Sequence, residues 1–176
     1  MPYKVTIETQ VKEIPYGNEG ILVSVSELVK IIKDYRKSPE IRLLAEDIVQ
    51  SCPSKDFVCE ATKIFDYVKK NIRFARDPYR VEMLRSPLIT LDRKNGDCDD
   101  HTILVNSLLQ SIGHPTRVVL VASRPYAPKN FNHIFTEVKL STREGDKWIP
   151  IDTTVSKSYF GWLPTGFNYK RIAVEE

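Results

Sequence analysis

The sequence predicts an α+β domain in which a block of helices precedes an antiparallel β-sheet. Apolar residues recur every three or four positions up to residue 72, and again from residue 98 to 112, which is the spacing of amphipathic helices. Beyond residue 113 the apolar residues alternate with polar ones or form β-branched runs, which is typical of strands. Helices followed by strands, without regular alternation of the two, favour an α+β fold with an antiparallel sheet.

The length favours one domain over residues 1–176. A chain of 176 residues suits a single core, and it shows no internal repeat and no Gly/Ser-rich linker. Along it we expect an N-terminal strand and turn, a helical part, a core segment and a C-terminal extension. Their ranges are 1–22, 24–72, 73–155 and 156–176.

Composition excludes several classes of protein. Lys and Arg number 26 against 23 Asp and Glu, a net charge of +3, which is too small an excess for a nucleic-acid-binding face. The longest apolar runs cover only a handful of residues, so we expect no membrane span. The start of the chain, Met1–Lys4, lacks the apolar stretch of a secretory signal. Three cysteines, an odd number, do not make a disulfide framework, so we expect a reduced, cytoplasmic protein.

Three helices are expected before residue 73. Ser24 and Glu27 have the spacing of a capping box that starts the first helix. The Ser-Pro pair at residues 38–39 ends that helix and starts the second. Ser54 can cap the third.

The rest of the chain divides into a loop, a helix and three strands. Residues 73–95 break the periodicity and predict a long, partly extended loop. A fourth helix is expected from Cys98 to Ile112, ended by Gly113. Strands are expected at residues 116–122, 134–140 and 148–153, besides a short one near the N-terminus at residues 3–8.

The cysteine that opens the fourth helix is a candidate nucleophile. Gly96 lets the backbone turn sharply, and Asp97 is a good N-cap residue. Cys98 then falls in the first turn, where free N–H groups and the positive end of the helix dipole favour the nucleophilic thiolate. Asp99 and Asp100 disfavour a nearby anion unless they are paired or point away. The alternative is a helix start that merely happens to carry a cysteine.

The other two cysteines lack this context. Cys59 lies within the helical repeat, and Cys52 precedes Pro53 at a helix end. We expect both to be structural. A disulfide between them stays open, because their spacing is not diagnostic.

One of the three histidines is placed to act with the thiol. His133 begins an alternating segment that leads through a polar turn at residues 141–146 toward Asp152. Opposed residues of a hairpin lie about 5–8 Å apart, so Asp152 can hold one ring nitrogen of His133 while the other faces the thiol, as in a Cys-His-Asp triad. The alternative is a polar cross-strand pair that only stabilises the sheet. His101 is expected on the surface or lining a groove, and His114 in a loop.

Three short blocks resemble a known family. The segments Gly96–Asp100, Asn132–Val138 and Trp148–Thr154 resemble the Cys, His and Asp blocks of the transglutaminase-like superfamily of papain-type folds, in the same chain order and with a Trp shortly before the Asp. The resemblance spans about residues 60–155. It is greater to bacterial and phage members than to the longer, calcium-regulated animal transglutaminases.

The resemblance implies a papain-like core whose nucleophile helix packs on the sheet. It also implies that Cys98 is the nucleophile, His133 the general base and Asp152 the residue that orients the histidine. The family often has Ala-Trp or Val-Trp after the histidine, whereas this chain has Ile134-Phe135.

A second oxyanion donor is not evident from the sequence. The backbone N–H of Cys98 is a natural first donor, and the second is expected from residues 73–95 or a neighbouring strand, with Tyr79 and Asn95 as candidates. Loss of one such donor typically costs about 100- to 1,000-fold in rate.

These features predict cysteine-dependent acyl transfer on amide bonds of a protein or peptide substrate, through a thioester intermediate. Peptide or isopeptide hydrolysis is favoured over transamidation because the chain is small. The alternative is a non-catalytic virion or assembly module that keeps the fold.

No cofactor or metal is expected. Asp97, Asp99, Asp100 and His101 offer ligand atoms, but consecutive side chains at a helix start fan around its axis and should not converge on one ion. Phosphate binding is excluded because no glycine-rich loop precedes a lysine.

Overall fold

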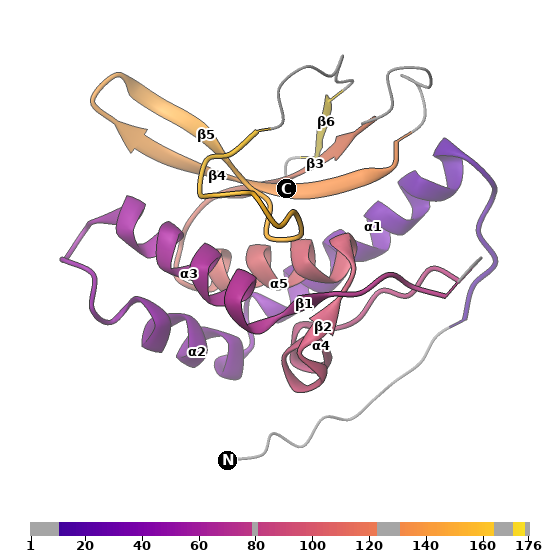
Figure 1. The fold of residues 1–176 in the computed structure, drawn as a ribbon, viewed down its shortest axis with the longest axis horizontal. Coiled ribbons are helices and arrows are strands. Elements are labelled where there is room, and N and C mark those ends of the chain that lie inside the picture. The colour runs from indigo at the N-terminus through magenta and orange to yellow at the C-terminus, as the bar shows by residue number, and fades with distance from the viewer. Residues whose placement is uncertain (1–10, 79–80, 123–130, 164–170, 175–176) are drawn as a thin grey trace.

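A layer of helices packs on one side of a four-stranded antiparallel sheet, as the sequence predicts (Figure 1). The computed structural model describes residues 11–78, 81–122 and 131–163, and the backbone of residues 171–174. The expected strand at residues 3–8 lies outside these ranges. The helices are α1 (Asn18–Tyr35), α2 (Pro39–Val49), α3 (Phe57–Asn71), α4 (Pro87–Arg93) and α5 (Cys98–Ser111). The strands are β1 (Arg73–Phe74), β2 (Asn95–Gly96), β3 (Thr116–Val121), β4 (His133–Thr142), β5 (Gly145–Ile151) and β6 (Arg171–Val174).

The sheet has the order β5-β4-β3-β6, and every neighbouring pair is antiparallel. The β4–β5 hairpin turns where Thr142 pairs with Gly145, within the predicted turn. The third expected strand ends at Ile151, so Asp152 follows β5 instead of lying in it. The C-terminal extension supplies β6 as an edge strand, which the sequence analysis did not anticipate.

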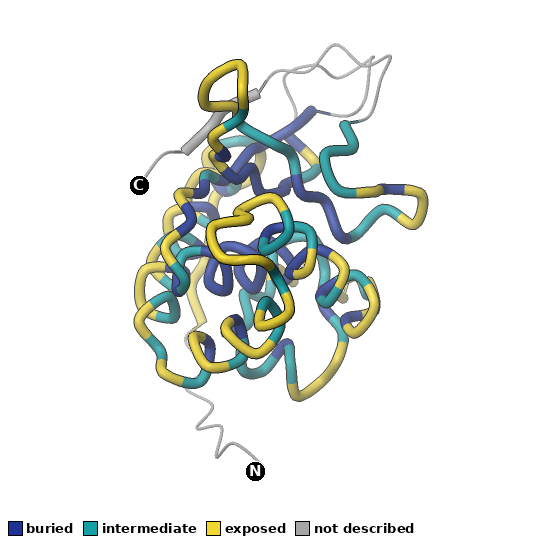
Figure 2. Tube along the Cα trace, turned by 90° about the vertical axis from the view of Figure 1, so that its left-hand side faces the viewer, coloured by how far each residue is buried: buried dark blue, intermediate teal, exposed yellow. Residues whose placement is uncertain are grey.

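Helix α5 forms the centre of the core. It packs against β4, and α1, α2 and α3 surround its other sides, so almost all of its residues are buried. Figure 2 shows the buried residues gathered in the interior, with exposed ones along the outer helices and turns. The polar Asn106 side chain is accommodated because it donates to Thr136 Oγ1 at 2.7 Å and accepts from Thr116 Oγ1 at 2.5 Å. A helix buried on all sides positions the residue at its start firmly.

Two helix starts differ from the predicted ones. Helix α1 begins at Asn18 after Gly17, whose φ of 75° suits glycine, so Ser24 lies inside the helix and the predicted capping box is wrong. The reason is that the apolar stripe begins before Ser24, because Ile21 already packs against the cluster that contains Val25 and Leu28. Helix α3 is capped by Asp56, which accepts from the Cys59 N–H at 2.9 Å, and not by Ser54.

The segment 73–95 is more ordered than a loop. Ser86 precedes Pro87 at the first position of α4, a favoured place for proline, and Lys94 ends the helix in a left-handed conformation. Strands β1 and β2 then pair in parallel. This pairing joins two distant chain segments, and it leads the backbone directly into Asp97 and the start of α5.

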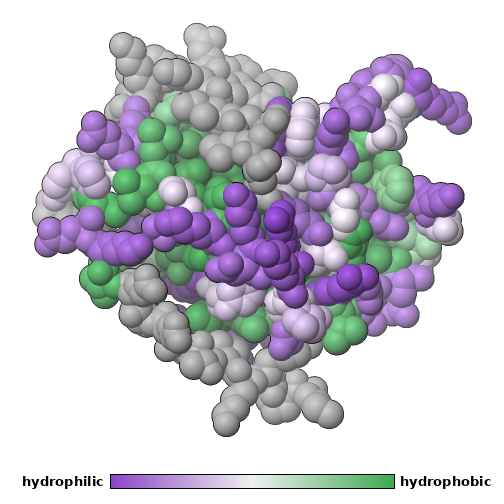
Figure 3. Space-filling view, turned by 180° about the vertical axis from the view of Figure 1, so that it is seen from behind, coloured by the Kyte–Doolittle hydropathy of each residue, from purple (hydrophilic) through white to green (hydrophobic). Residues whose placement is uncertain are grey.

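Cys52 and Cys59 form a disulfide, the pairing that the sequence left open, so the expectation of a reduced protein is wrong for these two cysteines. Cys98 is the free cysteine. No helix among the described residues is long and apolar enough to cross a membrane. The back of the molecule mixes both kinds of surface, with hydrophilic side chains across its middle and hydrophobic ones to either side (Figure 3).

Candidate active site

A reciprocal cap holds Cys98 at the first position of α5. Asp97 Oδ1 accepts from the N–H groups of Asp99 and Asp100 at 3.0 and 3.2 Å, and the Asp100 carboxylate accepts from the Asp97 N–H at 3.3 Å. A Cβ on Gly96 would lie 2.6 Å from the Asp100 Cβ, so only glycine fits there. These contacts fix the direction in which the helix starts, and with it the Cys98 side chain.

The environment of Cys98 favours the neutral thiol. Burial raises its pKa well above the usual value, and the negative charges of Asp99, Asp97 and Glu82 raise it further. A hydrogen bond from the backbone N–H of Ile134 acts in the opposite direction. The expected resting thiolate is therefore not favoured. The same hydrogen bond places the sulfur beside the residue that follows His133.

His133 and Asp152 form a hydrogen-bonded pair. His133 Nε2 lies 2.7 Å from Asp152 Oδ2, and the aspartate is only 4% exposed. The other carboxylate oxygen, Oδ1, accepts from the N–H and the hydroxyl of Thr154 at 3.0 and 2.7 Å. Burial opposes ionisation of Asp152, but these hydrogen bonds outweigh it and lower the pKa. An ionised Asp152 assigns the Nε2–H tautomer to a neutral His133, which leaves Nδ1 as the proton acceptor.

His101 lies in the interior and not on the surface. Its Nδ1 is 2.7 Å from the hydroxyl of Thr153, next to Asp152. Burial lowers the pKa of His101 to about 4, against the opposing charge of Asp152, so the ring is neutral near pH 7. In the sequence, the only indication of this buried position is that His101 lies three residues after Cys98 on a strongly apolar helix. His114 instead pairs with Glu60 at 2.7 Å, beyond the far end of α5.

Arg85 is a further part of the site that the sequence analysis missed. Its guanidinium pairs with Asp100, and its backbone N–H donates to the same carboxylate at 2.9 Å. It also donates to Asp77 at 2.9 Å. Arg85 thereby ties the segment that carries Glu82 to the start of α5.

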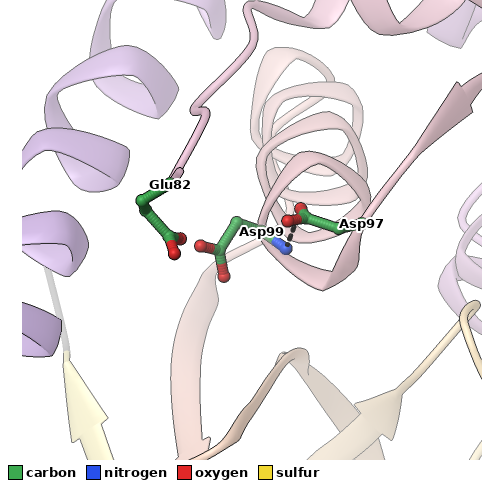
Figure 4. A group of neighbouring side chains, drawn as sticks. All are labelled: Glu82, Asp97 and Asp99. Carbon is green, nitrogen blue, oxygen red and sulfur yellow. Dashed lines mark hydrogen bonds between the residues drawn. The ribbon is translucent and has the colours of Figure 1, made fainter. Parts of the chain in front are cut away.

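Three carboxylates gather beside the thiol. Oxygens of Glu82, Asp97 and Asp99 lie within 4.8 Å of one another, and the Glu82 and Asp99 side chains point toward each other (Figure 4). Burial, then the charge of Asp100, raises the pKa of Asp97 to about 7. Burial and Glu82 raise the pKa of Asp99 well above its usual value.

This cluster corrects the expectation that the carboxylates diverge. Glu82 joins Asp97 and Asp99 because its segment is bound to the helix start through Arg85. Asp100 is bound to Arg85 and His101 to Thr153, so neither belongs to the cluster. Three oxygen ligands of this kind suit a hard divalent cation such as Ca²⁺.

The two suggested oxyanion donors gain no support. The Asn95 side chain donates to the carbonyl of Arg93 at 3.0 Å. Tyr79 lies outside the described residues. The backbone N–H of Cys98 stays the expected first donor.

The comparison with family models decides the relationship. Residues 42–153 match the model of the transglutaminase-like superfamily, which is well over half of the chain. The chain belongs to this superfamily. No curated protein sequence matches the chain.

Solved structures with the same fold are known from bacteria. A proposed cysteine protease from Cytophaga hutchinsonii is 18% identical, with a TM-score of 0.52 over 73% of this chain and 42% of its own. A proposed protease from Parabacteroides distasonis is 15% identical, with a TM-score of 0.55 over 88% of this chain and 32% of its own. The present chain thus spans less than half the length of either.

LapG of Legionella pneumophila is more similar in size. It is 20% identical in its calcium-bound form, with a TM-score of 0.51 over 77% of this chain and 76% of its own. An EGTA-treated form has the same TM-score and identity. These likenesses show that the chain has the same fold as these proteins, in agreement with the superfamily match.

Proposed function

We propose that this protein is a cysteine peptidase that cleaves amide bonds in a protein or peptide through a thioester. The observation that carries the proposal is the His133–Asp152 hydrogen bond of 2.7 Å. It is supported by a free cysteine at a helix start, whose sulfur accepts from the backbone N–H of Ile134, the residue after His133. The proposal assigns Cys98 as nucleophile, His133 as general base and acid, and Asp152 as the residue that orients His133.

The reaction begins from a neutral thiol. As the Cys98 sulfur bonds to the substrate carbonyl carbon, its proton passes to His133 Nδ1, and the resulting imidazolium is stabilised by Asp152. The backbone N–H of Cys98 donates to the developing oxyanion. His133 then returns the proton to the leaving amine as the C–N bond breaks, which leaves a thioester on Cys98.

A second nucleophile completes the cycle. Water gives its proton to His133, attacks the thioester and releases a carboxylic acid, with the proton returned to the Cys98 sulfur. A primary amine in place of water would give transamidation instead. We propose hydrolysis as the main reaction, with a peptide or isopeptide as substrate.

The test is thiol labelling followed by product analysis. We expect iodoacetamide to modify Cys98 at neutral pH, and His133→Ala to slow this reaction. Mass spectrometry of a peptide library treated with the enzyme should show hydrolysed peptides, and also amidated ones when putrescine is added. Cys98→Ala is the control for both measurements.

The outcomes separate the alternatives. If every product that depends on Cys98 carries putrescine and none is hydrolysed, the protein is a transamidase and not a peptidase. Cys98 labelling that is indifferent to His133, together with no products, would reject catalysis and favour the non-catalytic virion or assembly module. The acidic surroundings of Cys98 are the feature that favours this alternative.

We also propose that the protein binds a divalent cation, with calcium preferred, at Glu82, Asp97 and Asp99. LapG has been solved with calcium bound, and the three carboxylates lie within 4.8 Å of one another. Bound calcium would supply positive charge that offsets the mutual repulsion of these carboxylates beside Cys98. The three side chains would hold the ion and so fix the segment around Glu82 against the start of α5.

A further inference from the structure

The segment that follows Asp152 is bound by a lysine from a distant helix. Lys69 lies in the last turn of α3, and its Nζ donates to Val155 O at 2.9 Å, to Ser158 O at 2.6 Å and to Ser158 Oγ at 2.8 Å. An ammonium group has three N–H donors, and three acceptors on one turn use them all. Most exposed lysines instead donate to water, so this contact is a specific one.

Ser158 continues the link to the aspartate itself. Its side chain is buried, and Oγ lies 2.5 Å from the carbonyl oxygen of Asp152 and 2.8 Å from that of Val155. The backbone N–H of Ser158 also donates to Val155 O at 3.0 Å. The chain of contacts therefore runs from Lys69 through Ser158 to the backbone of Asp152.

The position of Lys69 is not explained by helix stability alone. Lys70 is in the same turn and is exposed, so it can interact with the helix dipole equally well. Burial lowers the pKa of the Lys69 ammonium, while the charges of Asp152 and Asp66 oppose this. A partly desolvated cation is retained here where it meets the turn after Asp152.

We propose that Lys69 is a positioning residue: through Ser158 it fixes the backbone of Asp152, and so the carboxylate that holds the His133 ring. The effect of Lys69 on catalysis rests on the proposed function, but its contacts with the turn after Asp152 do not. Without Lys69 three acceptors lose the donor that joins them to α3, and the turn from residue 153 to 158 gains freedom. A displacement of about 1 Å in a catalytic group can cost on the order of 100-fold in rate.

The experiment compares Lys69→Met, Lys69→Arg and the matched control Lys70→Met in the full chain. ¹⁵N NMR of the histidine rings reports the Nε2–H signal of His133, assigned by its loss in His133→Ala. We expect Lys69→Met to weaken or shift this signal, Lys69→Arg to restore most of it, and Lys70→Met to leave it unchanged. With a substrate in hand, Lys69→Met should lower kcat by about 10- to 100-fold with little change in KM.

The NMR spectrum tests the role of Lys69 even if the protein turns over no substrate. The role of Lys69 can therefore be rejected independently of the proposed function. Identical His133 signals in Lys69→Met and Lys70→Met would overturn it, as would a loss in Lys69→Met that arginine does not reverse. If Lys69→Met does not fold, Ser158→Ala breaks the same link one step later. An unchanged His133 signal in that variant would likewise reject the role.

Discussion

At the scale of single residues, the charge state of Cys98 is decided by its surroundings and not by the helix. A helix N-terminus favours an anion by about 0.3–1 kcal/mol, and this argument predicts a thiolate. Burial and three nearby carboxylates raise the Cys98 pKa instead. The dipole is the smaller effect because the helix start is enclosed by the segment that carries Glu82. In the proposed reaction, activation of the Cys98 nucleophile therefore comes from proton transfer to His133 during attack.

The same scale gives a prediction for Asp152. Asp152→Asn keeps the size of the side chain but removes the charge that favours the Nε2–H tautomer of His133, so kcat should fall by about 10⁴-fold, as for the equivalent change in a serine-protease triad. Steady-state kinetics on the peptide identified by mass spectrometry provide the measurement. Asp146→Asn, on an exposed aspartate of β5, is the control and should retain full activity. Equal kcat values for the two variants would exclude an orienting role for Asp152.

Asp152 also has a pH-dependent effect on stability. The pKa of Asp152 is lower in the folded protein than its ordinary value of about 3.9, so its carboxylate stabilises the fold above that value. This contribution is lost as the pH falls through the folded-state pKa.

At the scale of elements, local signals predicted most of the fold. Asp97 before the apolar stripe of α5, Pro39 at the start of α2 and the polar turn of the β4–β5 hairpin each specify a boundary through nearby residues. Two of the site residues could be proposed because they lie at the open end of one hairpin, with His133 at the start of β4 and Asp152 directly after β5.

Contacts between distant segments could not be predicted in this way. The parallel pairing of β1 with β2, the Arg85–Asp100 ion pair and the reach of Lys69 to Ser158 all join parts of the chain with no shared periodicity. For the same reason the convergence of Glu82 with Asp97 and Asp99 was missed. Glu82 lies in the segment that Arg85 anchors to α5.

The three carboxylates of Glu82, Asp97 and Asp99 lie where the segment around Glu82 meets the start of α5, and they predict that calcium stabilises the fold. Calcium added to protein dialysed against EGTA should raise the Tm, since a ligand at 100 times its Kd adds about 2.7 kcal/mol, or about 5–10 °C for a chain of this size. Glu82→Gln removes one ligand without disturbing the cap and should abolish most of the rise. Glu144→Gln, at an exposed glutamate of the β4–β5 turn, should behave as the wild type. A Tm that calcium leaves unchanged, or raises equally in Glu82→Gln, would argue against the cation site.

At the scale of the whole molecule, α3 connects the two ends of α5. Near its start, Glu60 hydrogen-bonds to His114 at 2.7 Å and Phe57 packs edge-on against the same ring, just beyond the end of α5. Near its end, Lys69 reaches the turn after Asp152. Helix α3 therefore runs antiparallel to α5 (Figure 1). The disulfide precedes the start of α3, toward the end of α5 opposite Cys98, and α5 is about 21 Å long.

This separation predicts that the disulfide stabilises the fold without affecting the site. Cys52 and Cys59 are seven residues apart, and closing so short a loop restricts the unfolded chain by about 2.5 kcal/mol. The variant Cys52→Ala/Cys59→Ala should therefore melt about 5–10 °C lower, while iodoacetamide labels Cys98 at the wild-type rate. Dithiothreitol should lower the Tm of the wild type and leave that of the double variant unchanged. Intact-mass analysis after alkylation without reductant should find one modified thiol, and three would show that the disulfide does not form.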